Sequence, residues 1–125
     1  MTSDHPMPVR RMKTYTGGQG YVYQYYFVGK RAALAGWVDP AMEYIFDVTS
    51  DRKTAFAVSI FLSEAAVGRW AASHGRELTE AEQYAAVKMR LFEAFDQIEN
   101  MIGEGRRLAV DAAALDRLLT LLGIE

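Results

Sequence analysis

The chain has 125 residues, of which 50% are hydrophobic and 24% are charged, with a net charge of −2 and no cysteine. This composition is typical of a globular protein and excludes a disordered chain, a disulfide framework and thiolate chemistry. The length predicts one domain, 1–125, with residues 1–9 as a flexible arm. We expect a cytoplasmic protein without a membrane span, because no run approaches about 20 apolar residues and no signal-peptide core is present.

Residues 10–16 alternate weakly between polar and apolar side chains and predict an edge strand. Residues 21–28 contain four tyrosines, one phenylalanine and two valines, with glycines on both sides. Aromatic and β-branched residues in such a run predict a central strand. The intervening Gly17-Gly18-Gln19-Gly20 is then the loop of a hairpin.

The letters Gly17-Gly18-Gln19 resemble the tripeptide with which class I peptide-chain release factors approach the peptidyl-transferase centre. The resemblance covers three residues and implies that the glutamine would orient a water molecule for hydrolysis. A phosphate-binding role for the same loop would require a helix after the glycines, whereas a strand follows them. The residues favour a turn that uses glycine for positive φ.

Two further runs, 43–49 and 55–62, alternate in hydrophobicity around a short polar loop. They predict a β-hairpin whose even-numbered residues face the core. Residues 30–36 fit either an extension of the tyrosine-rich strand or a connection. Val38-Asp39-Pro40 predicts a turn, because a residue before proline avoids the α region.

The second half of the chain predicts three helices. Ser63 is a candidate N-cap of the first, which ends at Gly75. Thr79 and Glu82 form a capping box at the start of the second, and Asp111 caps the third. The predicted spans are 64–74, 79–102 and 112–122. Strands followed by helices predict an α+β fold, an antiparallel sheet of three or four strands followed by three helices packed on one face.

Five aromatic side chains share one side of the early strands: Tyr15, Tyr21, Tyr23, Tyr25 and Phe27. Three interpretations are open, namely an intramolecular core, a homodimer or protein interface, and a surface that stacks single-stranded bases. In the third interpretation, the basic residues that would contact phosphates are Arg10, Arg11, Lys13, Lys30 and Arg31.

A pocket between the sheet and the helices is a further hypothesis, and its candidate lining is Tyr44, Asp47, Trp70 and His74. His74 at a helix end is also suited to capping. Glu43 and Asp47 share a strand side but lie too far apart for a tight pair of carboxylates. No acidic or histidine cluster has metal-ligand spacing, so we predict neither a metal site nor a cofactor.

The sequence favours a non-enzymatic interaction module that forms a homodimer through the aromatic strand or the C-terminal helices. The alternatives are that the chain binds another protein, that it binds single-stranded nucleic acid, or that it binds a small molecule in an enzymatic or binding pocket. The acidic net charge disfavours nucleic acid, and no catalytic constellation with defined spacing supports an enzyme. No membrane partner is expected.

Overall fold

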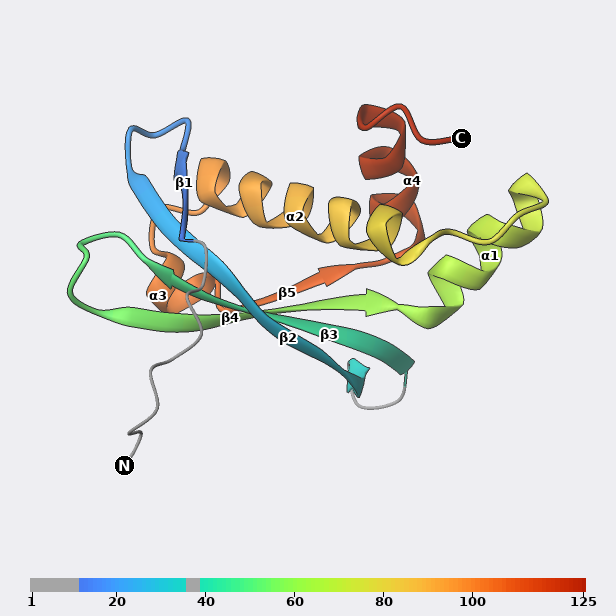
Figure 1. Ribbon diagram of the computed structural model, residues 1–125, viewed down its shortest axis with the longest axis horizontal. Coiled ribbons are helices and arrows are strands. Elements are labelled where there is room, and N and C mark those ends of the chain that lie inside the picture. Colours follow the sequence, from blue (N-terminus) through green and yellow to red (C-terminus); the bar gives the residue numbers. More distant parts are fainter. Residues whose placement is uncertain (1–11, 36–38) are drawn as a thin grey trace.

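The computed structural model describes residues 12–35 and 39–125, so the predicted arm over 1–9 and the basic residues Arg10 and Arg11 lie outside the described residues. Within them the chain forms an α+β fold with a five-stranded sheet and four helices (Figure 1). The elements are β1 Lys13–Thr16, β2 Val22–Ala35, β3 Asp39–Thr49, β4 Ala55–Ser63, α1 Glu64–His74, α2 Glu80–Gln97, α3 Met101–Glu104, β5 Arg107–Val110 and α4 Ala112–Leu121. The predicted α+β class is confirmed, but the sheet is mixed instead of antiparallel and the described residues form five strands and four helices instead of three or four strands and three helices.

Strands β1 to β4 form an antiparallel meander in which each strand pairs with the next. The predicted hairpin is β3–β4, where Tyr44 is opposite Ile60 and Phe46 is opposite Val58. All four side chains are buried. The even-numbered residues of this hairpin therefore face the core, as their alternation predicts.

Strand β2 is longer than the tyrosine-rich run alone, because residues 30–35 continue it. Its register against β3 shifts between Phe27 and Gly29, which marks a β-bulge. The turn predicted at 38–40 is wrong for Asp39 and Pro40, which begin β3, while Val38 lies outside the described residues. Proline is tolerated there because it stands at the start of a strand.

The helix starts follow the sequence signals. Ser63 caps α1 through its side chain, and Gly75 ends that helix with a φ of 71°. Thr79 and Glu82 form the predicted capping box of α2. Glu82 also accepts two hydrogen bonds of 2.9 Å from Arg76, which are the main reason why its pKa falls to about 2.

The long predicted helix ends early. α2 stops at Gln97 instead of continuing to about Ile102, because Ile98 adopts an extended conformation (φ −103°, ψ 111°). Asn100 then caps the short helix α3 with its side chain. This break redirects the chain so that Met101 enters the core.

Strand β5 was not predicted, and it makes the sheet mixed instead of antiparallel. It runs parallel to β4, with Leu108 opposite Ile60 and Val110 opposite Leu62. The connection between these two strands contains α1, α2 and α3. Only two apolar residues of β5 face the core, which is too short a pattern for a prediction from sequence.

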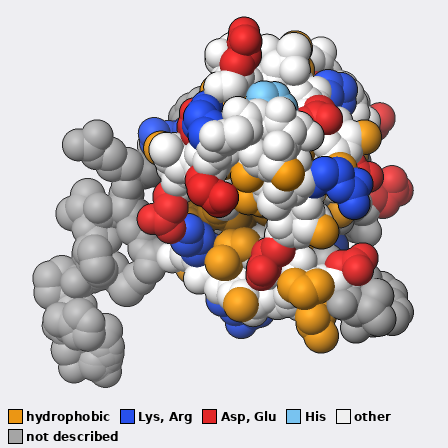
Figure 2. All heavy atoms as spheres, turned by 90° about the vertical axis from the view of Figure 1, so that its right-hand side faces the viewer, with side chains coloured by type: hydrophobic (Ala, Val, Ile, Leu, Met, Phe, Trp, Pro, Cys, Tyr) orange, Lys and Arg blue, Asp and Glu red, His pale blue; other side chains and the backbone are white. Residues whose placement is uncertain are grey.

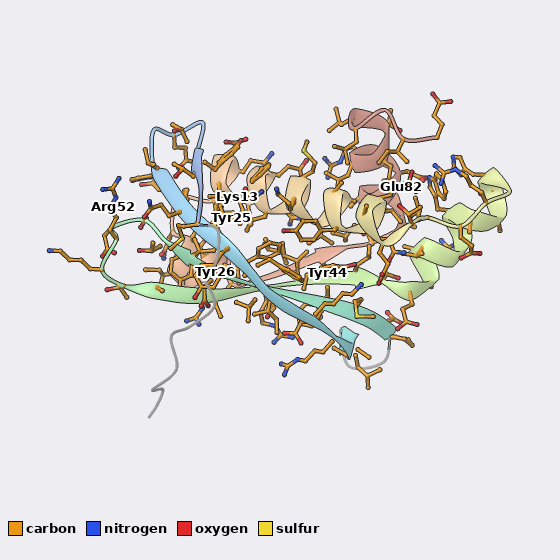
Figure 3. The ribbon with its side chains drawn as sticks, viewed as in Figure 1. Lys13, Tyr25, Tyr26, Tyr44, Arg52 and Glu82 are labelled. Carbon is orange, nitrogen blue, oxygen red and sulfur yellow. The ribbon has the colours of Figure 1, made fainter. Side chains whose placement is uncertain are left out.

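The helices leave the two faces of the sheet different. α2 and α4 lie on one side, which we call the inner face, and α1 and α3 lie at the two ends (Figure 1). The opposite side is the outer face, and no described helix lies against it. The main hydrophobic cluster takes these inner-face residues from the strands: Tyr23, Tyr25, Tyr44, Phe46, Val48, Phe56, Val58, Ile60, Leu62, Leu108 and Val110. Ala41 and Phe61 are buried at outer-face positions and do not belong to this cluster. Tyr44 lies between the sheet and α2 (Figure 3).

Candidate interaction surface

The tyrosines at the centre of β2 belong to the core. Tyr23 and Tyr25 are 3% and 4% exposed. The Tyr23 ring stacks on Phe95 of α2 with centroids 4.2 Å apart, and Tyr25 meets the ring of Phe92 edge to face. Helix α2 thus covers the side on which these aromatics lie. Three interpretations of the aromatic strand were open. For Tyr23 and Tyr25, the structure agrees with the intramolecular core.

Tyr15 fixes the β1–β2 hairpin to the end of α2. Its ring stacks on Phe92 at 4.4 Å, and its hydroxyl donates to the Asp96 carboxylate at 2.9 Å. Gly18 N donates to the same carboxylate at 2.7 Å. The glycine loop is therefore docked on α2, and Gly17 fits there because an added Cβ would lie 2.8 Å from Phe95 O. These contacts give the loop a structural role.

A lysine lies among the aromatic rings of the inner face. Lys88 Nζ is 5.7–5.9 Å from the ring centres of Tyr25, Tyr84 and Phe92. Desolvation, and next the charge of Lys13, lowers the pKa of Lys88. Three ring faces therefore solvate this cation in place of a carboxylate. Lys13 is opposite Tyr25 in the β1–β2 register and shares this face.

The outer edge of β2 is only partly covered. β1 pairs with residues 22–25, and no described strand pairs with residues 27–34 on that side. Eight large hydrophobic side chains are exposed in the described chain, and six of them lie on or beside β1 and β2. We call these six the edge surface: Met12, Tyr21, Val22, Phe27, Val28 and Leu34. The other two are Ile102 and Leu121.

The edge surface includes side chains from both faces of the sheet. Val22 points to the outer face, whereas Phe27 and Leu34 point to the inner face, as their pairing with β3 and the alternation of the strand require. Phe27 contacts the rings of Phe46 and Tyr84, and 36% of it stays exposed. Along the uncovered residues 27–34, Phe27 and Leu34 thus present apolar groups on the inner side, while Val22 lies where β1 pairs with β2.

The bulge separates the two basic residues of β2. Lys30 lies on the inner side, where its ammonium group pairs with Glu80 at 2.7 Å and lies 5.5 Å from the Tyr44 ring centre. Arg31 lies on the outer side and pairs with Glu43. Of the proposed phosphate-binding cations that the structure describes, Lys30 and Arg31 are therefore on opposite sides of the strand, and both are already paired with carboxylates.

Glu43 is buried in the outer face, although no helix covers it. It is 6% exposed and accepts hydrogen bonds from Arg31 Nε at 2.8 Å and Ser59 Oγ at 2.6 Å. The hydrogen bond from Arg31 is the largest of the effects that lower the pKa of Glu43. A carboxylate held ionised in this way is a poor general base. Glu43 joins β2, β3 and β4 through these two hydrogen bonds. The sequence did not predict this role because it depends on the order of the strands in the sheet.

The four residues proposed to line one pocket are separated. Tyr44 is buried on the inner face, whereas Asp47 is on the outer face and accepts a 2.7 Å hydrogen bond from the Tyr26 hydroxyl. Trp70 and His74 are together on α1, with stacked rings 3.9 Å apart. His74 Nδ1 is 2.9 Å from Trp70 O, so the ring donates to a carbonyl one turn earlier in the same helix. This hydrogen bond does not reach the last carbonyls of α1, and the capping role of His74 stays a prediction.

No family model, curated protein or solved structure matches this chain. Within residues 12–35 and 39–125, no group of three or more acidic or histidine side chains is placed to hold a metal ion. In the same residues, no helix has both the length and the apolar character needed to cross a membrane. The edge surface is the most distinctive candidate for function that the described residues present.

Proposed function

We propose that this protein is a non-enzymatic interaction module that forms a homodimer through the edge surface. The observation that carries the proposal is the concentration of six exposed apolar side chains along β1 and β2. Contiguous exposed apolar groups mark interaction sites in soluble proteins. An exposed strand edge adds a row of backbone donors and acceptors that a second strand can pair with.

A second copy of the chain fits this edge. The basic residues of the edge strand are compensated within one chain, Lys30 by Glu80 and Arg31 by Glu43, so the edge does not demand an acidic partner. The side chains left exposed around them are apolar and can contact their own copies across a two-fold axis. Edge-to-edge pairing along residues 27–34 would cover Phe27 and Leu34, whereas stacking of two outer faces would leave both of them exposed.

The test is the mass in solution, measured by light scattering behind a sizing column over a concentration series at low and high salt. Val28→Glu places a charge on the edge surface, and Leu121→Glu is the matched control because Leu121 is a comparably exposed apolar residue on α4. We expect wild type and L121E to be dimers in both salts and V28E to be a folded monomer. Tyr23 is unsuitable for this test because it is buried.

Two results contradict the proposal. Wild-type protein that stays monomeric at every concentration excludes self-association. A monomeric L121E beside a dimeric V28E moves the interface to the C-terminal helix. Far-UV circular dichroism of both variants shows whether each keeps its secondary structure, so loss of the fold is not mistaken for loss of the dimer.

A further inference from the structure

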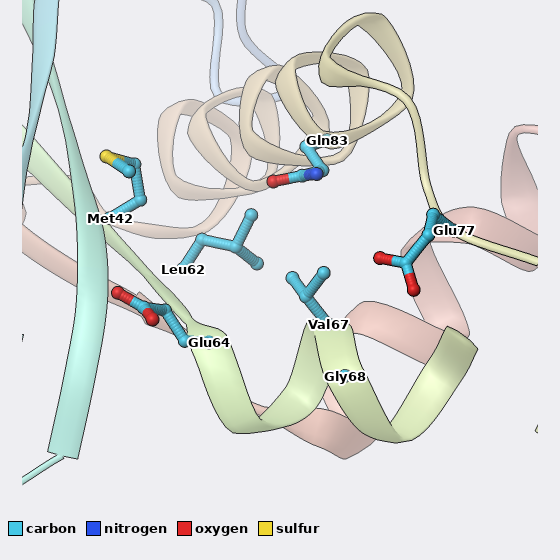
Figure 4. Close-up of a pocket in the computed structure, with 7 residues that line it drawn as sticks. All are labelled: Met42, Leu62, Glu64, Val67, Gly68, Glu77 and Gln83. Atoms are coloured by element: carbon cyan, nitrogen blue, oxygen red, sulfur yellow. The ribbon is translucent and has the colours of Figure 1, made fainter. Parts of the chain in front are cut away.

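A cleft at the end of the sheet is separate from the edge surface. It opens between the ends of β3 and β4, helix α1 and the start of α2, and its volume is about 250 Å³ (Figure 4). Its apolar lining comes from Met42, Leu62 and Val67. The space-filling view shows hydrophobic side chains in a hollow on this side of the molecule, with acidic side chains nearby (Figure 2). Pockets for drug-sized ligands measure about 300–1,000 Å³, so the cleft suits a smaller molecule.

Two carboxylates border the cleft without a partner among the described residues. Glu64 and Glu77 lie at opposite ends of it, with Leu62 and Val67 between them (Figure 4). Lys30 and Arg76 do not neutralise these two carboxylates. Lys30 pairs with Glu80, and Arg76 pairs with Glu82. The cleft therefore has an apolar floor and two negative charges that no described side chain neutralises.

Gln83 adds a hydrogen-bond acceptor to the cleft. Its amide nitrogen donates to Leu78 O at 3.3 Å. The amide oxygen is left without a described donor, and Gln83 lines the same cleft as the two carboxylates. All three polar groups can therefore accept hydrogen bonds, which suits a ligand that carries only donors.

Gly68 keeps the cleft open. It lies inside α1, where glycine is less favourable than alanine. Its φ is not positive, and an added Cβ would meet no atom within 4 Å, so neither the backbone nor the packing requires glycine. Gly68 lines the cleft, and a side chain there would occupy space that a ligand can use.

We propose that this cleft binds a small aliphatic diamine. One ammonium group pairs with Glu64 and the other with Glu77, while the methylene chain lies on Leu62 and Val67. An ammonium group carries three donors and no acceptor, which matches the carboxylates and the Gln83 oxygen. The apolar floor favours a ligand with a hydrocarbon segment between its charges.

The test is isothermal titration of the full chain with diaminopropane, diaminobutane, diaminopentane and diaminohexane, and with butylamine, butanol and butyrate as controls. We expect one diamine length to bind best, butylamine to bind more weakly, and butanol and butyrate not to bind. Each of Glu64→Gln and Glu77→Gln should weaken binding of the best diamine by roughly 1.4- to fivefold, the range for an exposed ion pair. Glu104→Gln removes an exposed acid outside the cleft and should leave the affinity unchanged.

Gly68→Leu tests the space in the cleft without altering its charge. Leucine is a good helix former, so the variant should remain folded while diamine binding falls at least about tenfold. The proposal is overturned if no diamine binds, if diamines bind no better than butylamine, if E104Q weakens binding as much as E64Q and E77Q, or if G68L binds like wild type. None of these outcomes depends on whether the protein is a dimer.

Discussion

Neighbouring residues of β2 have very different environments on the two sides of the strand. Tyr23 on the inner side is 3% exposed, while Val22 beside it is 47% exposed. Both residue types are common in strands, so residue type does not explain the difference. Helix α2 lies over one side only, and its Phe95 stacks on Tyr23. The difference between Tyr23 and Val22 is therefore decided by an element about 70 residues further along the chain.

The largest loss of stability is expected from Phe95→Ala, which tests the contact between α2 and the inner side of β2. Phe95 is completely buried, and its ring stacks on Tyr23 and contacts Tyr25. Removing it leaves a cavity between α2 and the sheet, so we expect the free energy of unfolding to fall by about 3–5 kcal/mol in urea denaturation. Gln24→Ala, on the other side of the same strand and outside the edge surface, is the control and should change it by less than about 0.5 kcal/mol. Equal losses in the two variants would mean that α2 does not distinguish the two sides.

A medium effect is expected on the outer face from Glu43→Gln. The substitution keeps the shape but removes the charge that Arg31 and Ser59 bind, and we expect a loss of about 1–3 kcal/mol in the free energy of unfolding at neutral pH. Glu99→Gln, at an exposed acid, is the control.

The pH dependence of the same variant has a defined sign. The pKa of Glu43 is lower in the folded protein than its ordinary value, so its contribution to stability is complete above that ordinary value. The contribution is lost as pH falls through the lowered pKa. The stability difference between wild type and E43Q should therefore shrink on acidification, and a constant difference would contradict the role of the charge.

The smallest effect is expected where α2 begins. Thr79→Ala removes the side chain that caps the helix, whose Oγ1 accepts from Glu82 N at 3.1 Å. Such a cap contributes about 1 kcal/mol to the free energy of unfolding, less than the contacts of Phe95 further along the same helix. Thr54→Ala in the exposed β3–β4 loop is the control. If T79A destabilises more than F95A, local capping and not the aromatic contact holds α2 on the inner face.

The elements that the sequence predicts best are those with a local cause. Ser63, Thr79 and Asp111 cap their helices as expected, because each capping bond joins residues three positions apart. The β3–β4 hairpin follows from alternation on two neighbouring runs. The early end of α2 was missed because the apolar spacing continues through Ile98 and Ile102 while the backbone changes direction between them.

The candidate surface could be predicted only in part. Tyr21 and Phe27 are exposed as an interface requires, whereas Tyr23 and Tyr25 are covered, and the sequence contains no local sign of which tyrosines α2 will cover. The exposed edge depends on β1 being four residues long beside a fourteen-residue β2. The cleft joins residues from β3, β4, α1 and α2, so it exists only once those elements are packed.

The distance along the chain between β2 and its covering helix has a consequence during synthesis. Tyr23 leaves the ribosome 72 residues before Phe95, the difference of their numbers, which is on the order of 4–14 seconds at about 5–20 residues per second. During that interval the meander of β1 to β4 can form while its aromatic side has no helix to cover it. Transiently exposed apolar surface is prone to aggregation, so a longer interval between β2 and α2 lengthens the period in which the nascent chain is at risk.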